Sequence, residues 1–228
     1  MKTGVAFITG SSSGIGQATA YAFAKAGYDM ILTYHSSKQD GEQTEKECKR
    51  LGADQTLLLK LDILNDKSIK VAAQAIKKKF GKIDVLVNNA GVLVWKELRK
   101  QDNKDIELQV RTDLESLIKI TLSFLSIVKK SIINISSQVG EMPFAGVSVY
   151  SAAKWGVRGF TKSLALEQPN LRVVSVNPGM TATKMTEMEG IPASEVADLI
   201  LATVEGRHEV ESGGDVDVWK IYNQNLPQ

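Results

Sequence analysis

Residues 5–16 read VAFITGSSSGIG and contain the features that decide the fold. The apolar run Val5–Thr9 is typical of a buried β-strand, and the pattern over Gly14–Ala26 is typical of a helix. The first glycine of the loop between them lets the chain turn sharply, and the next two let the backbone approach a pyrophosphate. The exposed amides at the helix N-terminus then face the anion. The spacing G-x-x-x-G-x-G is a variant of the usual dinucleotide fingerprint.

The rest of the chain alternates between short β-type runs and longer amphipathic stretches. The expected strands are Val5–Thr9, Met30–Tyr34, Thr56–Leu61, Ile83–Val87, Ser131–Ile135, Leu171–Val176 and Asp215–Ile221. The expected helices are Gly14–Ala26, Asp40–Leu51, Asp66–Phe80, Lys104–Val128, Tyr150–Glu167 and Ala193–Val204. This order predicts an α/β fold with a doubly wound parallel sheet of about seven strands flanked by helices. No linker rich in Pro, Gly or Ser divides residues 1–228, so we expect one domain.

The composition excludes several classes of function. The chain has 28 basic and 26 acidic side chains and a net charge of +2, which favours neither nucleic acid nor an anionic membrane as a partner. Cys48 is the single cysteine, so an internal disulfide is excluded, and with only His35 and His208 we expect no metal site. The apolar run Val5–Ile8 is too short for a signal peptide or a membrane span. We therefore expect a cytoplasmic protein.

The end of the second strand bears on the choice of nucleotide. NAD-binding sheets usually place a carboxylate there to hold the ribose 2′-hydroxyl. Here the residues Tyr34, His35, Ser36 and Lys38 precede the first carboxylate, Asp40. Hydroxyl groups and a lysine could accept a 2′-phosphate, so NADP(H) is favoured and NAD(H) stays an alternative. We interpret the histidine as a neighbour of the ribose or adenine and not as a catalytic base.

Tyr150 and Lys154 lie one helical turn apart on the same face of an expected helix. A cation at that position is expected to lower the phenol pKa and make the tyrosine usable as an acid or base. The spacing alone carries little information, because Tyr21 with Lys25 and Tyr34 with Lys38 share it. Tyr21 is better explained by packing of its helix against the sheet.

The context of Tyr150 is more specific than its spacing. The fifth strand runs into Ser136 and Ser137, and Tyr150 begins the next helix. The carboxyl ends of the strands are where an open α/β sheet binds ligands, so a hydroxyl and a phenol could converge there on one carbonyl oxygen. We assign that role to Ser137 and expect Ser136 to cap a turn.

With these motifs in this order, the chain resembles the short-chain dehydrogenase/reductase family in its short, single Rossmann-type form. The resemblance extends from Thr9 to about Val204 and includes the glycine loop, Leu61-Asp62-Ile63, Asn88-Asn89-Ala90-Gly91 and Pro178-Gly179. It implies an NAD(P)(H)-dependent enzyme whose catalytic residues are Ser137, Tyr150, Lys154 and Asp113. The cofactor-binding residues that it implies, with those of the second strand, are Gly10, Ser12, Ser13, Gly14, Ile15, Gly16, Tyr34, His35, Ser36, Lys38, Asp62, Ile63, Asn88, Ala90, Gly91, Tyr150, Lys154, Pro178, Gly179, Thr181 and Thr183.

The resemblance also implies roles. Tyr150 would exchange a proton with the substrate oxygen, Ser137 would hydrogen-bond that oxygen, and Lys154 would bind the nicotinamide ribose. Asp113 stands where the family usually has an asparagine that holds a water for proton relay. A carboxylate can hold that water as an acceptor, but it cannot donate as an amide does. Proton relay is therefore expected to be altered here, unless Asp113 is not the equivalent residue.

The expected substrate is a small to medium hydrophobic ketone, aldehyde or alcohol, under a small lid over residues 180–195. The apolar residues expected to wall its pocket are Val92, Leu93, Val94, Trp95, Val139, Met142, Pro143, Phe144, Met180, Met185 and Met188. A homodimer or homotetramer is expected, because the helices at Lys104–Val128 and Tyr150–Glu167 are apolar beyond one face. The residues behind that prediction are Leu117, Ile118, Phe124, Leu125, Trp155, Val157 and Phe160. Two alternatives stay open: an NAD-dependent alcohol dehydrogenase, and a dinucleotide-binding redox sensor without turnover.

Overall fold

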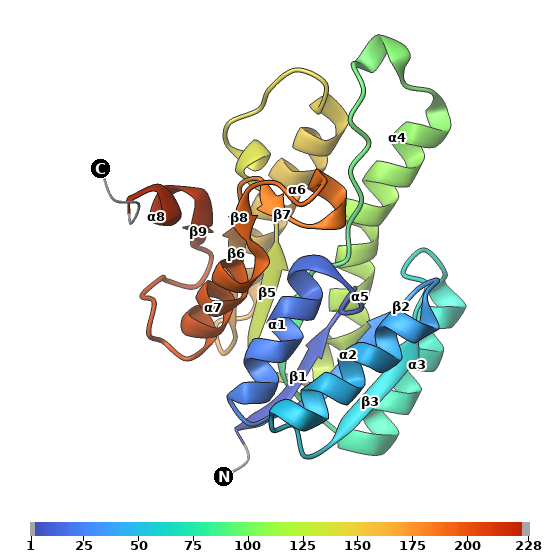
Figure 1. The fold of residues 1–228 in the computed structure, drawn as a ribbon, viewed down its shortest axis with the longest axis vertical. Coiled ribbons are helices and arrows are strands. Elements are labelled where there is room, and N and C mark those ends of the chain that lie inside the picture. The colour runs from blue at the N-terminus through green and yellow to red at the C-terminus, as the bar shows by residue number, and fades with distance from the viewer. Residues whose placement is uncertain (1–2, 225–228) are drawn as a thin grey trace.

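The computed structural model describes residues 3–224 and contains one seven-stranded parallel sheet covered by helices on both faces (Figure 1). The strand order is β3-β2-β1-β4-β5-β6-β9. The strands are β1 (Gly4–Ile8), β2 (Tyr28–Tyr34), β3 (Thr56–Lys60), β4 (Ile83–Asn88), β5 (Val128–Ile135), β6 (Arg172–Asn177) and β9 (Asp215–Asp217). This confirms the doubly wound α/β fold expected from the sequence.

The strand order reverses between β1 and β4. The chain winds from β1 to β3 in one direction and from β4 to β9 in the other, and β1 pairs directly with β4. Connections on either side of such a reversal leave the sheet on opposite faces, which opens a crevice at the carboxyl ends of the strands. The loop that follows Ile8 and the loop that follows Asn88 therefore border the same crevice.

The two faces of the sheet pack against different helices. Alternate residues of β1 show this, because Ala6 and Ile8 belong to one core cluster and Val5 and Phe7 to the other. The first cluster is completed by α1 (Gly14–Lys25), α2 (Lys38–Leu51) and α7 (Ala193–Val204). The second is completed by α3 (Asp66–Phe80), α5 (Ser116–Phe124) and α6 (Ser148–Glu167). Strands buried on both faces explain the consecutive apolar residues in the sequence.

One expected helix is wrong in its extent. The stretch 104–128 is divided into α4 (Asn103–Val110), a π-helical turn (Arg111–Glu115), α5 and a short 3₁₀ turn (Leu125–Ile127), and Val128 already belongs to β5. A π turn holds one more residue than an α turn, which shifts the helix face that follows it. Here it buries two consecutive side chains, Thr112 and Asp113.

The last expected strand is also wrong in its extent. Strand β9 ends at Asp217, and helix α8 (Val218–Gln224) follows at once. Short apolar runs do not distinguish a strand from a helix by periodicity alone, which explains the error. Two further short strands, β7 (Thr181–Ala182) and β8 (Ile191–Pro192), pair in parallel within the region expected to form a lid.

The oligomer prediction rested partly on residues that pack within the chain. Leu117, Phe124 and Val157 are buried in the core, whereas Ile118 and Trp155 are exposed. Only the exposed residues still suggest a contact with another copy. Among residues 3–224, no helix is long and apolar enough to cross a membrane.

Candidate active site

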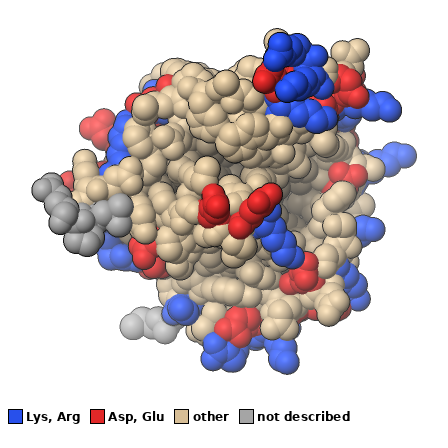
Figure 2. Space-filling view, turned by 45° about the horizontal axis from the view of Figure 1, so that its top comes forward, with Lys and Arg blue, Asp and Glu red and all other residues tan. Residues whose placement is uncertain are grey.

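A cavity of about 520 Å³ lies at the carboxyl ends of the strands and is bordered by the segments that follow β1, β2, β3, β4, β5 and β6. Figure 2 shows a hollowed face on which most charged side chains lie toward the edges and a few acidic and basic ones stand near the middle. Most residues expected at the site line this cavity: Gly10, Ser12, Ser13, Gly14, Ile15, Tyr34, His35, Asp62, Ile63, Ala90, Gly91, Asp113, Ser137, Tyr150, Lys154, Pro178, Gly179, Thr181 and Thr183. The expected residues that do not line it are Gly16, Ser36, Lys38 and Asn88.

The glycine loop has the tight conformation that its residues predicted. Gly10 has φ +66° and Gly14 has φ +56°, a backbone region that side chains disfavour. A Cβ on Gly16 would collide with the carbonyl oxygen of Gly10, so this glycine acts through close packing behind the cavity. The side-chain amide of Asn89 donates to the carbonyl oxygens of Thr9 and Gly10, at 2.9 and 3.3 Å. Asn89 thereby fixes the loop from β4.

The N-terminus of α1 is open to an anion. Ser13 is its N-cap residue, but the Ser13 side chain makes no capping hydrogen bond within the described part of the chain. The first turn also has no acidic residue, unlike the first turns of α2 and α3, whose N-caps Ser37 and Asn65 do make capping bonds. The unsatisfied amides and the positive end of the helix dipole therefore face the cavity side of Gly14. This arrangement suits a pyrophosphate group.

The end of β2 presents Tyr34 and His35 to the cavity. Among residues 3–224, no carboxylate from the end of β2 lines the cavity. This agrees with the sequence, in which Asp40 is the first carboxylate after β2. Lys38 is the first residue of α2, is 69% exposed in its side chain, and forms an ion pair with Glu42 at 3.0 Å. It follows His35, a residue of the cavity wall, by three positions in the sequence. Its own side chain does not line the cavity in this conformation.

Two neighbouring serines at the end of β5 have different tasks. Ser136 is buried, and its hydroxyl donates to the carbonyl oxygen of Lys154 at 2.8 Å. The expectation that Ser136 caps a turn is therefore wrong, because its side chain fixes α6 to the sheet. Ser137 is the N-cap of a 3₁₀ turn (Gln138–Gly140), and its Oγ accepts a hydrogen bond from the Val139 amide at 3.4 Å. Ser137 also lines the cavity, as Tyr150 and Lys154 do.

Lys154 is held in place by two contacts. Its side chain is 4% exposed, and its ammonium donates to the carbonyl oxygen of Ile135 at 3.1 Å. The same ammonium lies 3.3 Å from Oδ1 of Asp113 and 5.4 Å from the centre of the Tyr150 ring. The π-helical turn, β5 and α6 thus bring one carboxylate, one ammonium and one phenol together at the cavity wall.

The Tyr150 phenol is not activated in the way that the sequence predicted. Burial raises its pKa above the ordinary value, Lys154 lowers it, Asp113 raises it again, and a hydrogen bond with Ser137 lowers it. The net direction is upward. Lys154 therefore acts in the expected sense, but burial and the nearby carboxylate outweigh it, and the prediction of a lowered pKa is wrong for the chain without ligand.

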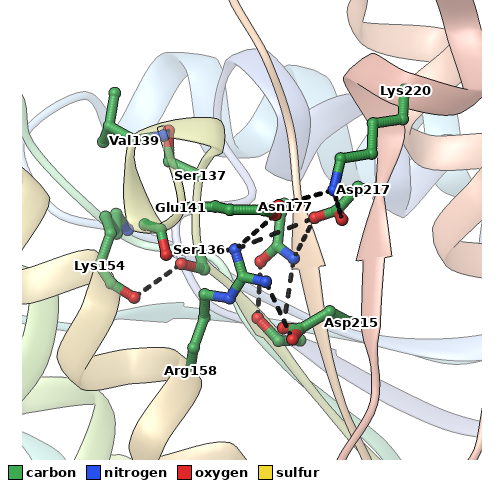
Figure 3. A network of polar contacts seen from close by, with 12 residues as sticks. Ser136, Ser137, Val139, Glu141, Lys154, Arg158, Asn177, Asp215, Asp217 and Lys220 are labelled. Carbon is green, nitrogen blue, oxygen red and sulfur yellow. Dashed lines mark hydrogen bonds and ion pairs between the residues drawn. The ribbon is translucent and has the colours of Figure 1, made fainter. Parts of the chain in front are cut away.

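Arg158 lies one turn beyond Lys154 on α6 and forms a second ionic cluster (Figure 3). Its guanidinium donates to Gly140 O, Glu141 and Asp215 at 3.1, 3.2 and 3.0 Å. Lys220 bridges Glu141 and Asp217 at 2.8 Å each. This cluster ties the turn after Ser137 to β9 and α8.

Sequence reasoning missed Arg158 and Asn89. Arg158 could have been found, because the residue four positions after Lys154 shares its helix face. Asn89 could also have been found in the quoted Asn88-Asn89 pair. Asn88 instead donates to Thr121 and Asn134 at 2.9 Å each, so it joins the sheet to α5 behind the cavity.

Part of the cavity wall is formed by apolar side chains. The predicted wall residues that line it are Val92, Leu93, Trp95, Val139, Phe144, Met180 and Met185. Val94, Met142, Pro143 and Met188 were also expected there and do not line it. The rings of Trp95 and Phe144 lie 5.4 Å apart, so two large side chains from separate loops form one wall. Within residues 3–224, no group of three His, Cys, Asp or Glu side chains is placed to hold a metal ion.

Comparisons with known proteins agree with this geometry. The short chain dehydrogenase family model matches residues 4–191. The chain is 38% identical over 190 residues to the 3-oxoacyl-[acyl-carrier-protein] reductase of Vibrio cholerae, covering 80% of this chain and 75% of that protein. It is 31% identical to the trans-4-hydroxycyclohexanecarboxylate dehydrogenase of Sinomonas cyclohexanicum, covering 98% and 95%. A crystal structure of a short chain dehydrogenase from Burkholderia cenocepacia in complex with NADP superposes with a TM-score of 0.87 at 26% identity, covering 94% and 96%.

Proposed function

Because this chain belongs to the short-chain dehydrogenase/reductase family, we propose that it is an NADP(H)-preferring oxidoreductase that interconverts a carbonyl and a hydroxyl on a small to medium hydrophobic substrate. The observation that carries the proposal is the convergence of Ser137, Tyr150 and Lys154 on one cavity that also contains the glycine loop. A protein that only sensed the nucleotide would need the loop, but it would not need the phenol and its cation.

The residues of the cavity suit a nicotinamide dinucleotide. The uncapped start of α1 would hold the pyrophosphate, and Asp62 and Ile63 would line the adenine. A Cβ at Gly91 would come within 2.6 Å of Asp113 and 3.6 Å of Lys154, so a side chain there would fill space beside the ammonium that binds the ribose. The end of β2 offers Tyr34 and His35 without a carboxylate, which favours a 2′-phosphate over a free 2′-hydroxyl.

A bound nicotinamide supplies or accepts the hydride, and the protein provides orientation and proton transfer. In the direction of reduction, the Tyr150 phenol donates its proton to the carbonyl oxygen of the substrate. The Ser137 hydroxyl hydrogen-bonds the same oxygen and orients it. Lys154 stabilises the phenolate that remains and would bind the ribose hydroxyls. The upward pKa shift of Tyr150 keeps this phenol protonated at neutral pH, as an acid must be.

The walls of the cavity favour an apolar substrate. Trp95 and Phe144 stand on one side, while Met180 and Met185 come from residues 180–195, which we propose as a small lid. Methionine side chains adapt to varied shapes. Two relatives are named for a 3-oxoacyl group and for a hydroxycyclohexanecarboxylate, and in both the reacting group is a ketone or secondary alcohol on a hydrocarbon frame. The proposed substrate therefore carries that group next to apolar carbon.

A homo-oligomer built through α5 and α6 remains part of the proposal. The exposed apolar side chains Ile118 and Leu122 on α5 and Trp155 and Leu166 on α6 support it. The cytoplasmic location inferred from the sequence also stays a prediction.

The test begins with fluorescence titrations of NADPH and NADH, followed by turnover on a panel of apolar ketones, aldehydes and secondary alcohols. We expect tighter binding of NADPH and turnover of one compound class. Tyr150→Phe should lower kcat by at least about a hundredfold, because it removes the proton donor, while cofactor binding persists.

Tyr21→Phe is the matched control, since Tyr21 also precedes a lysine by four residues but packs beside the core on α1. It should keep wild-type turnover. If Tyr150→Phe retained kcat within tenfold of wild type, another group would transfer the proton. If neither nucleotide bound, the proposed function would be wrong.

A further inference from the structure

Asp113 is a buried carboxylate in an unusual segment of the chain. It lies in the π-helical turn Arg111–Glu115 and is 1% exposed. π turns inside α-helices are rare and frequently occur at functional sites. Gly156 of α6 lets this turn approach closely, because a Cβ there would come within 2.8 Å of the Leu114 side chain. The approach places the carboxylate against the ammonium of Lys154.

The two oxygens of Asp113 differ in their surroundings. Oδ1 lies 3.3 Å from the Lys154 ammonium and accepts a hydrogen bond from the Val92 amide at 3.3 Å. Oδ2 is buried and has no hydrogen-bond partner within residues 3–224. Since buried polar atoms are nearly always paired, an unpaired carboxylate oxygen at a cavity wall indicates a group under functional constraint.

The ionisable groups that face one another here are Asp113 from the π turn and Tyr150 and Lys154 from α6. Neutral dipoles complete the surroundings: Ser137 after β5, the Ile135 carbonyl of β5, the Val92 amide after β4, and Gln109 of α4. The other charged residues of the π turn, Arg111 and Glu115, pair with each other at the surface at 3.5 Å. The charge next to Tyr150 is thus the sum of one cation and one anion.

We propose that Asp113 is a positioning residue that acts as the counter-ion of Lys154, keeps Tyr150 in its neutral phenol form, and thereby sets the site for carbonyl reduction at neutral pH. A lone ammonium next to the phenol would favour the phenolate, which is the base that alcohol oxidation requires. With the carboxylate paired to that ammonium, the net charge near the phenol is close to zero. The link to carbonyl reduction rests on the proposed function. The effect of Asp113 on the ionisation of Tyr150 concerns only Asp113, Lys154 and Tyr150 in the protein without nucleotide.

The proton that Tyr150 exchanges explains why a neutral phenol favours reduction over oxidation. In reduction, the carbonyl carbon gains a hydride from the reduced nicotinamide, which is thereby oxidised, and the carbonyl oxygen gains the Tyr150 proton. In oxidation, the alcohol carbon gives up a hydride to the oxidised nicotinamide and the Tyr150 phenolate takes the hydroxyl proton, so turnover depends on the fraction of phenolate present. Asp113 raises the pKa of Tyr150, as burial does, and so lowers that fraction at neutral pH.

The deciding experiment is an ultraviolet absorbance titration of tyrosinate in the protein without nucleotide. The Tyr150 signal is obtained by subtracting the curve of the Tyr150→Phe variant in each background. Asp113→Asn should lower the midpoint of Tyr150 ionisation by about one pH unit, which is a tenfold larger phenolate fraction at neutral pH. Asp113→Ser should move it in the same direction, which keeps the test available if one variant folds poorly.

Glu115→Gln is the matched control, because it removes an anion from the same π turn but at the surface. It should leave the midpoint unchanged. With a substrate in hand, the pH profile of kcat/KM for alcohol oxidation should move to lower pH in Asp113→Asn by the same interval. A midpoint that stays the same or rises in both Asp113 variants overturns the inference. Because the titration needs no turnover, a failure of the proposed function would leave this result intact.

Discussion

Lys154 and Arg158 occupy the same face of α6, one turn apart, and both are largely buried cations, yet their surroundings differ. Arg158 donates to one carbonyl and two carboxylates, and Asp217 lies 4.0 Å away. Lys154 has one carbonyl and one carboxylate, and that carboxylate, on Asp113, keeps an oxygen without a partner among residues 3–224. Only Lys154 lines the cavity.

The difference shows that the Arg158 cluster is structural, whereas the Lys154 ammonium can still bind a ligand. Arg158 makes three hydrogen bonds to protein groups, and these contacts connect the turn after Ser137 with β9. The Lys154 ammonium can donate to a ligand, since it carries three protons and has two protein acceptors. Removing each cation should therefore damage different properties of the protein.

The largest expected difference is between Lys154→Met and Arg158→Met. Lys154→Met should lower kcat/KM by a factor on the order of 10²–10⁴, because the phenolate loses its cation. The fold should persist, since burial raises the pKa of Asp113 and the carboxyl can take up a proton when its partner is absent. Arg158→Met should instead lower the unfolding free energy by about 2 kcal/mol, because it removes a largely buried cation together with its hydrogen bonds to Gly140, Glu141 and Asp215. Steady-state kinetics and denaturant unfolding measure the two effects.

Lys162→Met provides the control for the second variant. Lys162 lies one further turn along α6 and also pairs with Asp215, at 3.4 Å, but its side chain is 59% exposed. Its loss should change the unfolding free energy by less than about 0.5 kcal/mol. If Arg158→Met lost more kcat/KM than Lys154→Met, the division between the two clusters would be wrong.

The pH dependence of stability should have opposite signs for the two clusters. Burial alone raises the pKa of Asp217, but hydrogen bonds from Lys220 and Asn177 outweigh it and hold the pKa below its ordinary value. Stabilisation from a depressed carboxyl pKa is present above the unfolded value, about 3.9, and is lost as the pH falls through the folded value. Asp217→Asn should therefore reduce the loss of Tm between about pH 5 and 3.

Asp113 should behave in the reverse way. Burial raises its pKa, against the opposing effects of Lys154, the Val92 amide and Gln109, so the folded state binds this proton more readily than the unfolded chain. Its contribution is present below the unfolded value and is lost as the pH rises through the folded value. Asp113→Asn should thus enlarge the loss of Tm on acidification. Thermal unfolding followed by circular dichroism across this range decides both signs, and equal slopes in the two variants would contradict the comparison.

The sequence predicted the sheet well because most strands, such as β1, β2 and β4, are buried on both faces, and most are followed by a helix with a clear pattern. It could not predict the π turn, because the extra residue is a compromise between the packing of Leu114 against Gly156 and the burial of Asp113. The resemblance to the family placed Asp113 at the site, but it did not predict the contact with Lys154. Nor does the sequence reveal that Val218 starts a helix, since a short apolar run suits either structure.

Side-chain reach was the least predictable property of the site. Residues of the glycine loop, Ser137, Tyr150 and Lys154 all line one cavity, because backbone geometry fixes them there, and their roles stay predictions. A long side chain at the edge of the cavity can reach several partners, and the sequence does not show which one it contacts. Lys38 was assigned to the cofactor on charge alone, and in the structure it turns to Glu42.

Lys38 is a far more exposed cation than Lys154 and Arg158, and its substitution has the smallest expected effect. Its pair with Glu42 is solvent-exposed on both sides and is worth little, so the ammonium can leave it for a 2′-phosphate at the end of β2. Lys38→Ala should raise the Kd for NADPH about fivefold, equivalent to about 1 kcal/mol, and leave the Kd for NADH unchanged. Lys46→Ala removes the same charge from an exposed position further along α2 and should alter neither value. Fluorescence titration measures both constants. An unchanged Kd for NADPH in Lys38→Ala would mean that other groups, with His35 the nearest candidate in the cavity wall, determine any preference for the phosphorylated cofactor.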